Sequence, residues 1–487
     1  MARVVVLGGG VAGHTTAQYL RKWLNKTHEV VVVTPNSQWN WIPSNIWVGV
    51  GKMDQKEVLF DLAPVYAKAG ITYIQAKGMI IHPEGSGENS KNFVTVEHTS
   101  VERAGEKEDV SYDYLVNATG PKLNFAATEG LGPDNGFTVS VCTASHAKHA
   151  ADELEKIIEA LKKGETKRIL IGTGHGMCTC QGAAFEYTFN VDHRLRKEGV
   201  RDKATITYIS NEYELGDFGV GGMHLKMGGY VTSAKVFAES LYAERDVRWI
   251  TRAHVNKVEK DKVHYENLAG EMKEEPYDFS MLIPPFAGSG MKAQDKNGED
   301  ITSSLFNPGG FMFVDADYSK GTAPYEEWSA EDWPRTCQNQ KYKNIFAAGI
   351  AFAPPHIISK PMKSPNGTPI NPTPPRTGMP SGMMGKAVAG SIYDMINGAS
   401  EPTHTACMAE MGAACVASAG KGFFSGTAVT MTMYPIIPNY KKYPDYGRDF
   451  GGTFGEIGLA GHWVKRILHT GFLWKAKMKP FWSIIPE

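Results

Sequence analysis

The first thirteen residues constrain the fold more than any other part of the chain. The apolar run Arg3-Val4-Val5-Val6-Leu7 is typical of a buried strand, and Gly8-Gly9-Gly10-Val11-Ala12-Gly13 follows it directly. The glycines match G-x-G-x-x-G, ahead of a helix-like stretch at residues 15–24. In such a unit the first glycine permits a tight turn, the second lets backbone N–H groups approach a pyrophosphate, and the third allows close packing. The turn therefore predicts a dinucleotide site, with Val11 and Ala12 at the positive end of the helix.

The adenosine end of this site departs from the usual pattern. The next strand, residues 29–33, should be followed by an acidic residue for the ribose hydroxyls, but Thr34 stands there. Asn36 or Ser37 could replace that acid as weaker partners.

Three further segments indicate alternating strands and helices. A second strand start, Arg168-Ile169-Leu170-Ile171-Gly172, follows a helix-like stretch at residues 144–163, and buried-strand patterns end in glycine at 114–120 and 344–349. Residues 354–380 are proline-rich and predict a stiff loop. Such alternation predicts an α/β protein with parallel sheets and helices on both faces. We expect a discontinuous dinucleotide-binding domain (1–125 and 330–400), a second Rossmann-like domain (126–329) and a C-terminal region (401–487).

Composition excludes several classes of protein. The net charge of −1 over 487 residues argues against nucleic-acid binding, which requires a concentrated basic face. No apolar run is long enough for a membrane span, and the early strand leaves no room for a signal peptide. Six cysteines are too few for a secreted disulfide scaffold.

The second glycine-rich turn is not an ordinary NADH site. Gly172-Thr173-Gly174-His175-Gly176-Met177 places Met177 at the third fingerprint glycine, and Cys178 and Cys180 follow. Glu212 could still contact a ribose, so NADH binding is weakened rather than excluded. A cysteine in the first turn of a helix is favoured as a thiolate. Because Cys178 and Cys180 are two residues apart, we expect only one of them to face a cofactor.

Two other segments resemble the FAD motifs of two-dinucleotide-fold flavoproteins. These are Ala118-Thr119-Gly120-Pro121-Lys122 and Ile345-Phe346-Ala347-Ala348-Gly349, although Ile350 replaces the usual acid after the last glycine. The resemblance implies FAD-dependent disulfide-reductase architecture, with Ala118, Thr119, Gly120 and Gly349 at the cofactor.

Several motifs resemble those of sulfide:quinone oxidoreductases, and the resemblance covers nearly the whole chain. The segment from Cys180 to Tyr187 is similar to one redox-cysteine motif of that family, and 401–412, which contains Cys407, is similar to the other. Further similar segments are Arg376-Thr377-Gly378, Pro43-Ser44-Asn45 and Val141-Cys142-Thr143. The proline-rich stretch and the tail suggest a divergent branch.

The resemblance assigns roles to these residues. Cys180 and Cys407 would form the redox pair, and Glu186 would be an acid/base or else a surface carboxylate. Cys142 would cover the site more readily than join the pair, and Cys337 and Cys415 receive no role. Asn45, Arg376, Thr377 and Gly378 would lie near the flavin. The implied partners are FAD, sulfide and a membrane quinone; a homo-oligomer is left open.

The tail has the composition of a membrane-surface helix. Residues 457–486 contain no acid, but they contain five cations interleaved with aromatic and aliphatic residues. The cations are Lys465, Arg466, Lys475, Lys477 and Lys479. Such a segment is expected to lie in the lipid headgroup plane rather than to cross it, which predicts a peripheral (monotopic) membrane protein. The alternative is a helix packed on the core.

Three other functions stay open. An NADH:quinone oxidoreductase of the same fold would share FAD and the tail without needing Cys180 or Cys407. A flavocytochrome-type sulfide dehydrogenase would not need the tail, and a non-catalytic flavin-binding membrane protein would not respond to sulfide.

Overall fold

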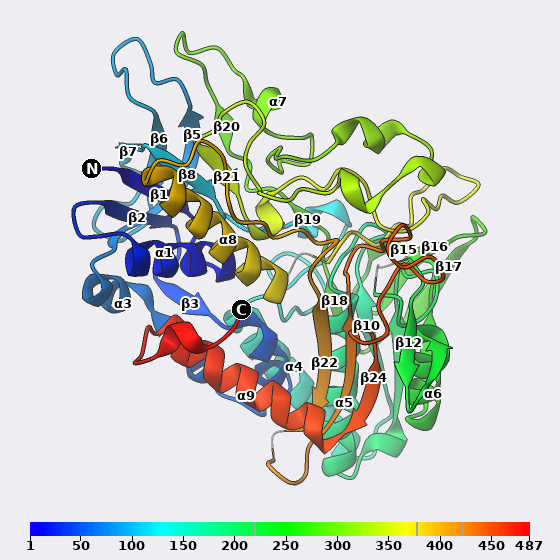
Figure 1. Cartoon of the computed structure of the whole chain (residues 1–487). Coiled ribbons are helices and arrows are strands. Elements are labelled where there is room, and N and C mark those ends of the chain that lie inside the picture. The colour runs from blue at the N-terminus through cyan, green and yellow to red at the C-terminus, as the bar shows by residue number, and fades with distance from the viewer. Residues whose placement is uncertain (219–220, 376–377, 421) are drawn as a thin grey trace.

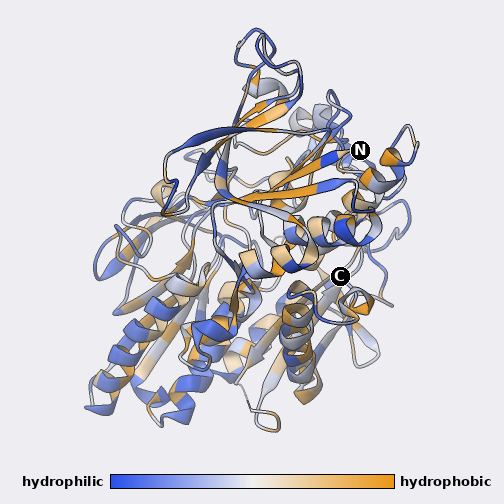
Figure 2. Cartoon of the chain, turned by 90° about the vertical axis from the view of Figure 1, so that its left-hand side faces the viewer, coloured by the Kyte–Doolittle hydropathy of each residue, from blue (hydrophilic) through white to orange (hydrophobic). Residues whose placement is uncertain are grey.

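A mostly parallel sheet forms the amino-terminal part of the fold (Figure 1). The computed structural model describes residues 1–218, 221–375, 378–420 and 422–487. In spatial order the strands are β21 (Ile345–Ala347), β8 (Tyr114–Asn117), β1 (Arg3–Leu7), β2 (Glu29–Thr34), β5 (Thr72–His82), β6 (Phe93–His98) and β7 (Lys107–Ser111), and β20 (Lys292–Ala293) also pairs with β5. β6 and β7 run antiparallel, whereas the others are parallel. The valines of β1 are fully buried, with α1 packed on β1 and β2 and with β7 also in contact with β1. Strands beside the N-terminus are mainly apolar in Figure 2.

The helices of this part place the glycine turn. α1 (Val11–Trp23) begins directly after the turn and packs against α8 (Met379–Ile396). α2 (Asn45–Gly49) contacts α4 (Ala144–Lys162), and α3 (Leu62–Ala69) packs on β5. α8 includes Pro380 in its first turn, so the proline-rich stretch is irregular only up to that helix. Pro fits there because the first helical N–H groups need no partner within the helix.

A second parallel sheet has the order β14 (Val247–Ile250), β11 (Ala204–Ile209), β10 (Lys167–Thr173) and β18 (Phe279–Ile283). α5 (Gln181–Lys197) packs on β10, and α6 (Ala234–Glu244) packs on β14. Antiparallel strands flank it: β12 (His224–Met227) with β13 (Tyr230–Ser233), and β15 (Ala253–Val258) with β16 (Lys262–Asn267) and β17 (Met272–Pro276). Two further antiparallel pairs form separate small sheets: β3 (Gln38–Asn40) with β4 (Leu59–Asp61), and β9 (Lys122–Leu123) with β19 (Phe286–Ala287). A short helix, α7 (Thr302–Leu305), follows β20 in the chain.

The C-terminal region adds a third sheet and a last helix. β22 (Ala413–Ala419), β23 (Thr427–Met433) and β24 (Gly455–Gly458) are antiparallel, and both α5 and α9 (Leu459–Ala476) pack on them. In Figure 1, α9 runs along one side of the molecule from this sheet towards α3. The chain then turns back to α1, where Trp482 meets Tyr19 edge to face at 5.1 Å. The domain boundaries expected from the sequence stay a prediction; β20, from the expected second domain, joins the first sheet.

Candidate active site

A cavity of about 860 Å³ joins the three sheets. It begins at the turn between β1 and α1 and reaches the start of α5, the strand β22 and the inner face of α9. Such a position, at the carboxyl ends of parallel strands, is where α/β folds bind nucleotides. The volume lies within the range of sites for small molecules and cofactors.

The backbone at the first turn fits a pyrophosphate. Gly8 has φ +104°, and a Cβ added there would lie 2.1 Å from the carbonyl oxygen of Ala118. A Cβ on Gly13 would lie 2.0 Å from the carbonyl oxygen of Gly8. A Cβ on Gly10 would meet nothing within 4 Å, and no side chain caps α1 at this residue. The first N–H groups of α1 therefore face the cavity, where a phosphate can accept their hydrogen bonds.

Most predicted cofactor residues line this cavity. They are Gly8, Gly10, Val11, Ala12, Ala118, Thr119, Gly120, Gly349 and Gly378. Asn117 supports the second motif, because its Oδ1 accepts hydrogen bonds from the Thr119 N–H at 3.3 Å and hydroxyl at 2.8 Å. Thr34 and Asn36 also line the cavity at its adenosine end. Arg376 and Thr377 lie outside the described residues.

Asn45 does not lie at the cavity wall, contrary to the prediction from its motif. Its side chain is fully buried and exchanges hydrogen bonds with Asn40, at 3.0 and 3.1 Å. Its Nδ2 also donates to the carbonyl oxygen of Val141 at 3.2 Å. Asn45 therefore fixes the segment before Cys142, while its neighbours Pro43 and Ile46 form the wall.

Three cysteines meet at the far end of the cavity: Cys142, Cys180 and Cys415. Cys180 is the residue before α5, with a left-handed φ of +64°, so neither Cys180 nor Cys178 lies in the first turn of the helix. Cys178 is fully buried, and its Sγ donates to the carbonyl oxygen of Ile283 at 3.1 Å. The geometry thus turns Cys180, and not Cys178, to the cavity.

Cys415, to which the sequence assigned no role, lies close to Cys180 at this end of the cavity. A Cβ added at Gly182, two residues after Cys180, would lie 2.7 Å from the Cys415 Sγ. Burial raises the pKa of Cys415 to about 12, with a contribution from the nearby Glu186 carboxylate, and burial likewise raises that of Cys142 to about 12.

The structure does not bring Cys407 beside Cys180 at the cavity wall, where the predicted pair would lie. Cys407 is buried and does not line the cavity. The Ala406 N–H donates to the carbonyl oxygen of Arg335 at 2.8 Å, and Arg335 forms a bidentate ion pair with Glu410 at 2.8 and 2.9 Å. These contacts hold the segment against residues 335–337, which do not line the cavity.

A buried ion pair stands beside the cysteines. Lys465 Nζ on α9 lies 2.9 Å from Glu186 Oε2 on α5, and both side chains are less than a tenth exposed and line the cavity. The Ser418 N–H donates to Glu186 Oε1 at 3.2 Å. Burial raises the pKa of Glu186, and Lys465 opposes this shift. Glu186 is thus no surface carboxylate, and the sequence missed Lys465 as a site residue.

The second glycine turn is filled by the protein itself. A Cβ on Gly174 would lie 2.6 Å from Leu131 Cδ1, and one on Gly176 would lie 2.5 Å from both His254 Nδ1 and the Pro369 carbonyl oxygen. The Gly176 N–H, which would face a phosphate in a nucleotide site, donates to His254 Nδ1 at 3.2 Å. No room is left at this turn for a pyrophosphate.

A loop from the proline-rich stretch, residues 364–373, covers this turn and is called the covering loop below. Its Asn371 and Thr373 N–H groups donate to the carbonyl oxygens of Gly176 at 2.8 Å and Cys178 at 3.1 Å. Glu266 holds the other end through the hydroxyl groups of Ser364 and Thr368. Glu212, considered for a ribose, is fully buried with Ser210 and Tyr208, and burial raises its pKa to about 8.

The tail packs on the core along one face and exposes apolar residues along the other. Lys475 is buried, with its Nζ 2.5 Å from Glu487 Oε1 and 2.6 Å from the Ile485 carbonyl oxygen. Two of the five predicted interface cations, Lys465 and Lys475, thus point inwards. The exposed apolar residues of the tail are Ile457, Trp463, Val464, Ile467, Trp474, Phe481 and Ile484. In the described part of the chain, the helices are too short or too polar to cross a membrane.

Comparisons with known proteins identify the class and the family of this chain. A model of the family described as pyridine nucleotide-disulphide oxidoreductase matches residues 2–203, which defines the class of the fold. The sulfide-quinone reductase of Aquifex aeolicus is 31% identical over 476 residues, covering 97% of this chain and 91% of that protein. This chain is also 24% identical to the mitochondrial sulfide:quinone oxidoreductase of Dictyostelium discoideum. The match covers 72% of this chain and 65% of that protein.

The solved structures give the same result. The X-ray structure of the Aquifex aeolicus sulfide:quinone oxidoreductase has a TM-score of 0.74 at 28% identity, covering 98% of this chain and 92% of that one. The chain belongs to the sulfide:quinone oxidoreductase family. The predictions of this family, of its fold class and of FAD as its cofactor are confirmed.

Proposed function

We propose that this chain oxidises sulfide at a disulfide formed by Cys180 and Cys415 and passes the electrons to a quinone. The observation that supports this most is the convergence of both cysteines on one end of the FAD cavity while the second nucleotide turn is closed. A closed turn leaves sulfur chemistry as the route by which electrons enter. FAD, which the glycine turn of β1 and α1 would hold, would supply the two-electron acceptor between the cysteines and the quinone.

The two cysteines have different chemical tasks. Hydrosulfide attacks one sulfur of the disulfide, a new S–S bond forms to that sulfur, and the other cysteine leaves as a thiolate. The raised pKa of Cys415 disfavours a thiolate there, whereas Cys180 stands at the positive end of α5. Cys180 is therefore the better leaving thiolate, and Cys415 receives the sulfur as a persulfide. A lower thiol pKa makes a faster leaving group.

Glu186 and Lys465 supply the protons that quinone reduction requires. Reduction of a quinone takes up two protons as well as two electrons, and a buried acid beside a cation can hold and release a proton at the cavity wall. Lys465 also presents its ammonium group to the cavity from α9. We assign to this pair the donation of protons to the quinone, which we place at the end of the cavity beside α9.

The measurement is the absorbance of the bound flavin during anaerobic addition of sulfide and then of a quinone. We expect sulfide to bleach the flavin of the wild type and a quinone to restore it. Cys180→Ser and Cys415→Ser should retain FAD and lose bleaching, whereas Cys407→Ser, the matched control, should behave as the wild type. Bleaching in Cys415→Ser together with its loss in Cys407→Ser would restore the original pairing and overturn this one.

The outer face of α9 supports docking on a lipid bilayer, where quinones dissolve. Trp463, Val464 and Ile467 point outwards from the helix that carries Lys465 on its inner face. Phe423 and Phe424 lie exposed next to them, and the Trp463 Nε1–H donates to the Phe423 carbonyl oxygen at 2.7 Å. Aromatic side chains of this kind settle at the headgroup level of a membrane. A peripheral position therefore brings the quinone to the cavity end at α9.

Point substitutions test the docking better than truncation, because removing α9 would leave Glu186 buried without Lys465. Ile467→Asp places a charge on the most exposed apolar position of α9. We expect it to reduce co-sedimentation with liposomes and turnover with a long-chain quinone, with sulfide bleaching unchanged. Val101→Asp, at an even more exposed apolar residue far from α9 in the sequence, is the control. Equal binding by both variants would contradict docking through α9.

A further inference from the structure

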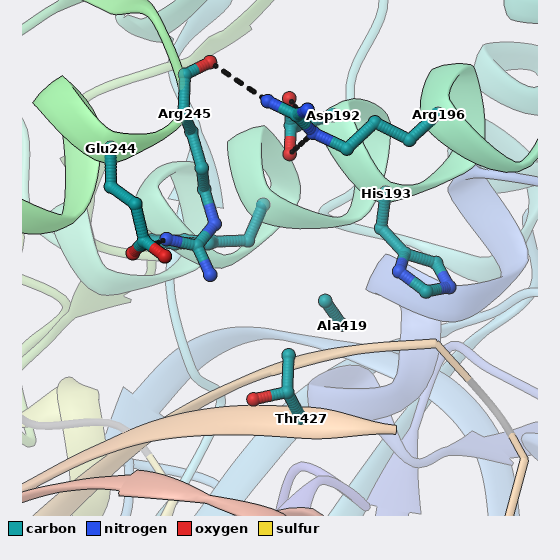
Figure 3. Close-up of a pocket in the computed structure, with 8 residues that line it drawn as sticks. Asp192, His193, Arg196, Glu244, Arg245, Ala419 and Thr427 are labelled. Carbon is teal, nitrogen blue, oxygen red and sulfur yellow. Dashed lines mark hydrogen bonds and ion pairs between the residues drawn. The ribbon is translucent and has the colours of Figure 1, made fainter. Parts of the chain in front are cut away.

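A second cavity, of about 280 Å³, lies beside the turn that joins β22 to β23. It is lined by residues from the ends of α5 and α6 and from the two strands: Phe189, Asp192, His193, Arg196, Glu244, Arg245, Ala419 and Thr427. Figure 3 shows the Arg245 guanidinium and the His193 ring on either side of the space in front of Ala419 and Thr427. None of these residues takes part in the proposed reaction.

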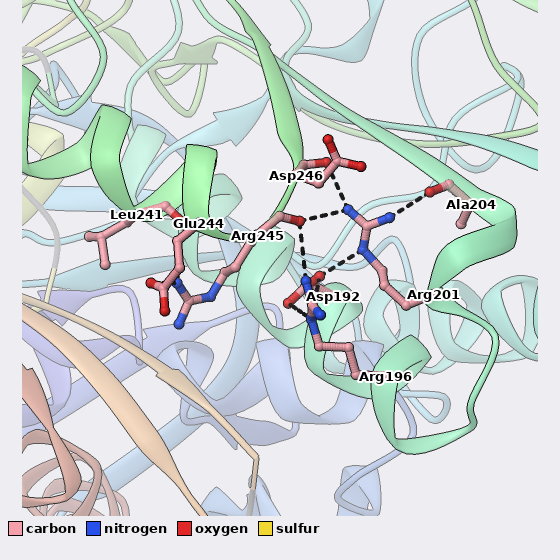
Figure 4. A network of polar contacts seen from close by, with 8 residues as sticks. All are labelled: Asp192, Arg196, Arg201, Ala204, Leu241, Glu244, Arg245 and Asp246. Carbon is pink, nitrogen blue, oxygen red and sulfur yellow. Dashed lines mark hydrogen bonds and ion pairs between the residues drawn. The ribbon is translucent and has the colours of Figure 1, made fainter.

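The cavity wall holds two carboxylates, and the buried one, Asp192, is paired with more than one cation. Asp192 forms ion pairs with two arginines, with Arg196 Nε at 2.9 Å from Oδ2 and Arg201 Nε at 2.7 Å from Oδ1 (Figure 4). Arg201 Nη2 also donates to the carbonyl oxygens of Arg245 and Asp246, both at 2.8 Å. This network fixes the end of α6 against α5, and the arginines Arg196, Arg201 and Arg245 exceed the carboxylates of Asp192 and Glu244 by one charge.

Arg245 is prepared to bind an anion. Its guanidinium stacks over the Phe189 ring at 4.8 Å from the ring centroid. The hydrogen bonds that described residues give it, to the Leu241 carbonyl oxygen and to the exposed Glu244, both use Nη1. The Nε and Nη2 hydrogens remain for a ligand, and a guanidinium offers such pairs of donors to phosphate oxygens.

The position of the cavity identifies where such a phosphate comes from. Ala419 and Thr427 are partners in the strand register, so the cavity wall is also the base of the turn that exposes Phe423 and Phe424. The Phe423 ring stacks on Trp463 of α9 at 5.3 Å. The basic cavity and the apolar surface proposed for docking are therefore parts of one hairpin. When aromatic residues settle at the headgroup level, the cavity stands where lipid phosphates lie.

We propose that this cavity binds the phosphate of an anionic phospholipid headgroup, with Arg245 and His193 as donors to its oxygens. The inference rests on the proposed docking of the chain on a membrane. It adds to that docking a stoichiometric lipid site, which fixes the orientation of the hairpin and of α9 on the bilayer.

The experiment measures binding of the full-length holoenzyme to two kinds of vesicle, phosphatidylcholine alone and phosphatidylcholine with a fifth of phosphatidylglycerol. Arg245→Gln should weaken binding to the anionic vesicles about fivefold, the loss expected for one cation near a membrane surface. Thr427→Glu, which puts a carboxylate into the cavity, should weaken it at least as much. Binding to neutral vesicles should stay the same in both variants, because it depends on the aromatic residues.

Arg248→Gln is the matched control, since it removes one exposed positive charge three residues away on β14. It should change anionic binding less than twofold. If Arg245→Gln and Arg248→Gln weakened anionic vesicle binding equally, the effect would come from general surface charge, and the proposed site would be refuted. The lipid assignment would be overturned if Arg245→Gln weakened the binding of inorganic phosphate but left the binding of anionic vesicles unchanged. Wild type that binds neither vesicle would refute the docking itself.

Discussion

Removing the ammonium group of Lys465 tests whether the ion pair with Glu186 holds α9 on the core. In Lys465→Met the stem of the side chain remains, but the Glu186 carboxylate stays buried without its cation, 2.9 Å from where Nζ was. Loss of one partner of a buried pair costs about 3–5 kcal/mol. At neutral pH the opening of α9 should therefore become roughly a hundredfold more frequent or greater, because about 1.4 kcal/mol corresponds to a factor of ten.

The pH dependence has a definite sign. Burial already raises the pKa of Glu186 against the influence of Lys465, so removal of Lys465 raises it further. A carboxyl group whose pKa is raised by folding stabilises the folded state below its ordinary pKa of about 4.5, and this stability is lost as the pH rises through the folded value. The variant should thus match the wild type near pH 4 and fall below it towards pH 8.

The assay is hydrogen exchange of the α9 amides, expressed as opening free energies at pH 5, 6, 7 and 8. The double variant Lys465→Met/Glu186→Gln should recover most of the loss, because Gln keeps an oxygen for the Ser418 N–H and has no charge to bury. A loss in Lys465→Met that is the same at every pH, or that the double variant does not relieve, would refute the account of a buried charge.

Other predictions concern the cofactor, the second turn and the tail. Gly8→Ala should abolish FAD binding, because its Cβ would lie 2.1 Å from a carbonyl oxygen, whereas Gly87→Ala, with nothing within 4 Å, should retain the flavin absorbance of the purified protein. NADH should reduce the flavin far more slowly than sulfide in stopped-flow absorbance, and a faster reaction with NADH would contradict the closed turn. Lys475→Glu should lower the melting temperature, since Lys475 is buried against Glu487; Lys479→Glu should leave it unchanged and weaken salt-sensitive liposome binding instead.

The local patterns of the sequence were sufficient to predict the first nucleotide-binding turn. The apolar run of β1 and the glycines after it define a unit whose geometry depends on a few neighbouring residues, and the structure forms it as expected. The same reasoning identified the irregular second turn from Met177. It could not show that Leu131 and the covering loop fill this turn, because those residues are far away in the sequence.

The choice between Cys407 and Cys415 shows where sequence reasoning fails. Cys407 stands in a segment that resembles a family motif, whereas Cys415 stands in a strand of small residues, Ala413–Ala419. Small residues on a strand indicate that another element packs closely on it, and here that element is α5 with Cys180 before its first residue. Lys465 and Lys475 were misread for a related reason: composition shows an excess of cations but not which of them face inwards.

The covering loop makes the loss of the second nucleotide site difficult to reverse. Replacing Met177 by glycine would restore the fingerprint in the sequence, but Leu131, His254 and the loop would still occupy the space in front of it. The hydrogen bonds from Asn371 and Thr373 also fix the backbone on both sides of Met177, so the turn holds its shape without any coenzyme. Where a coenzyme would bind and dissociate, this chain has a covalently attached loop that joins the turn after β10 to Glu266 of β16. A coenzyme at this turn would therefore require a different path of the backbone at residues 364–373.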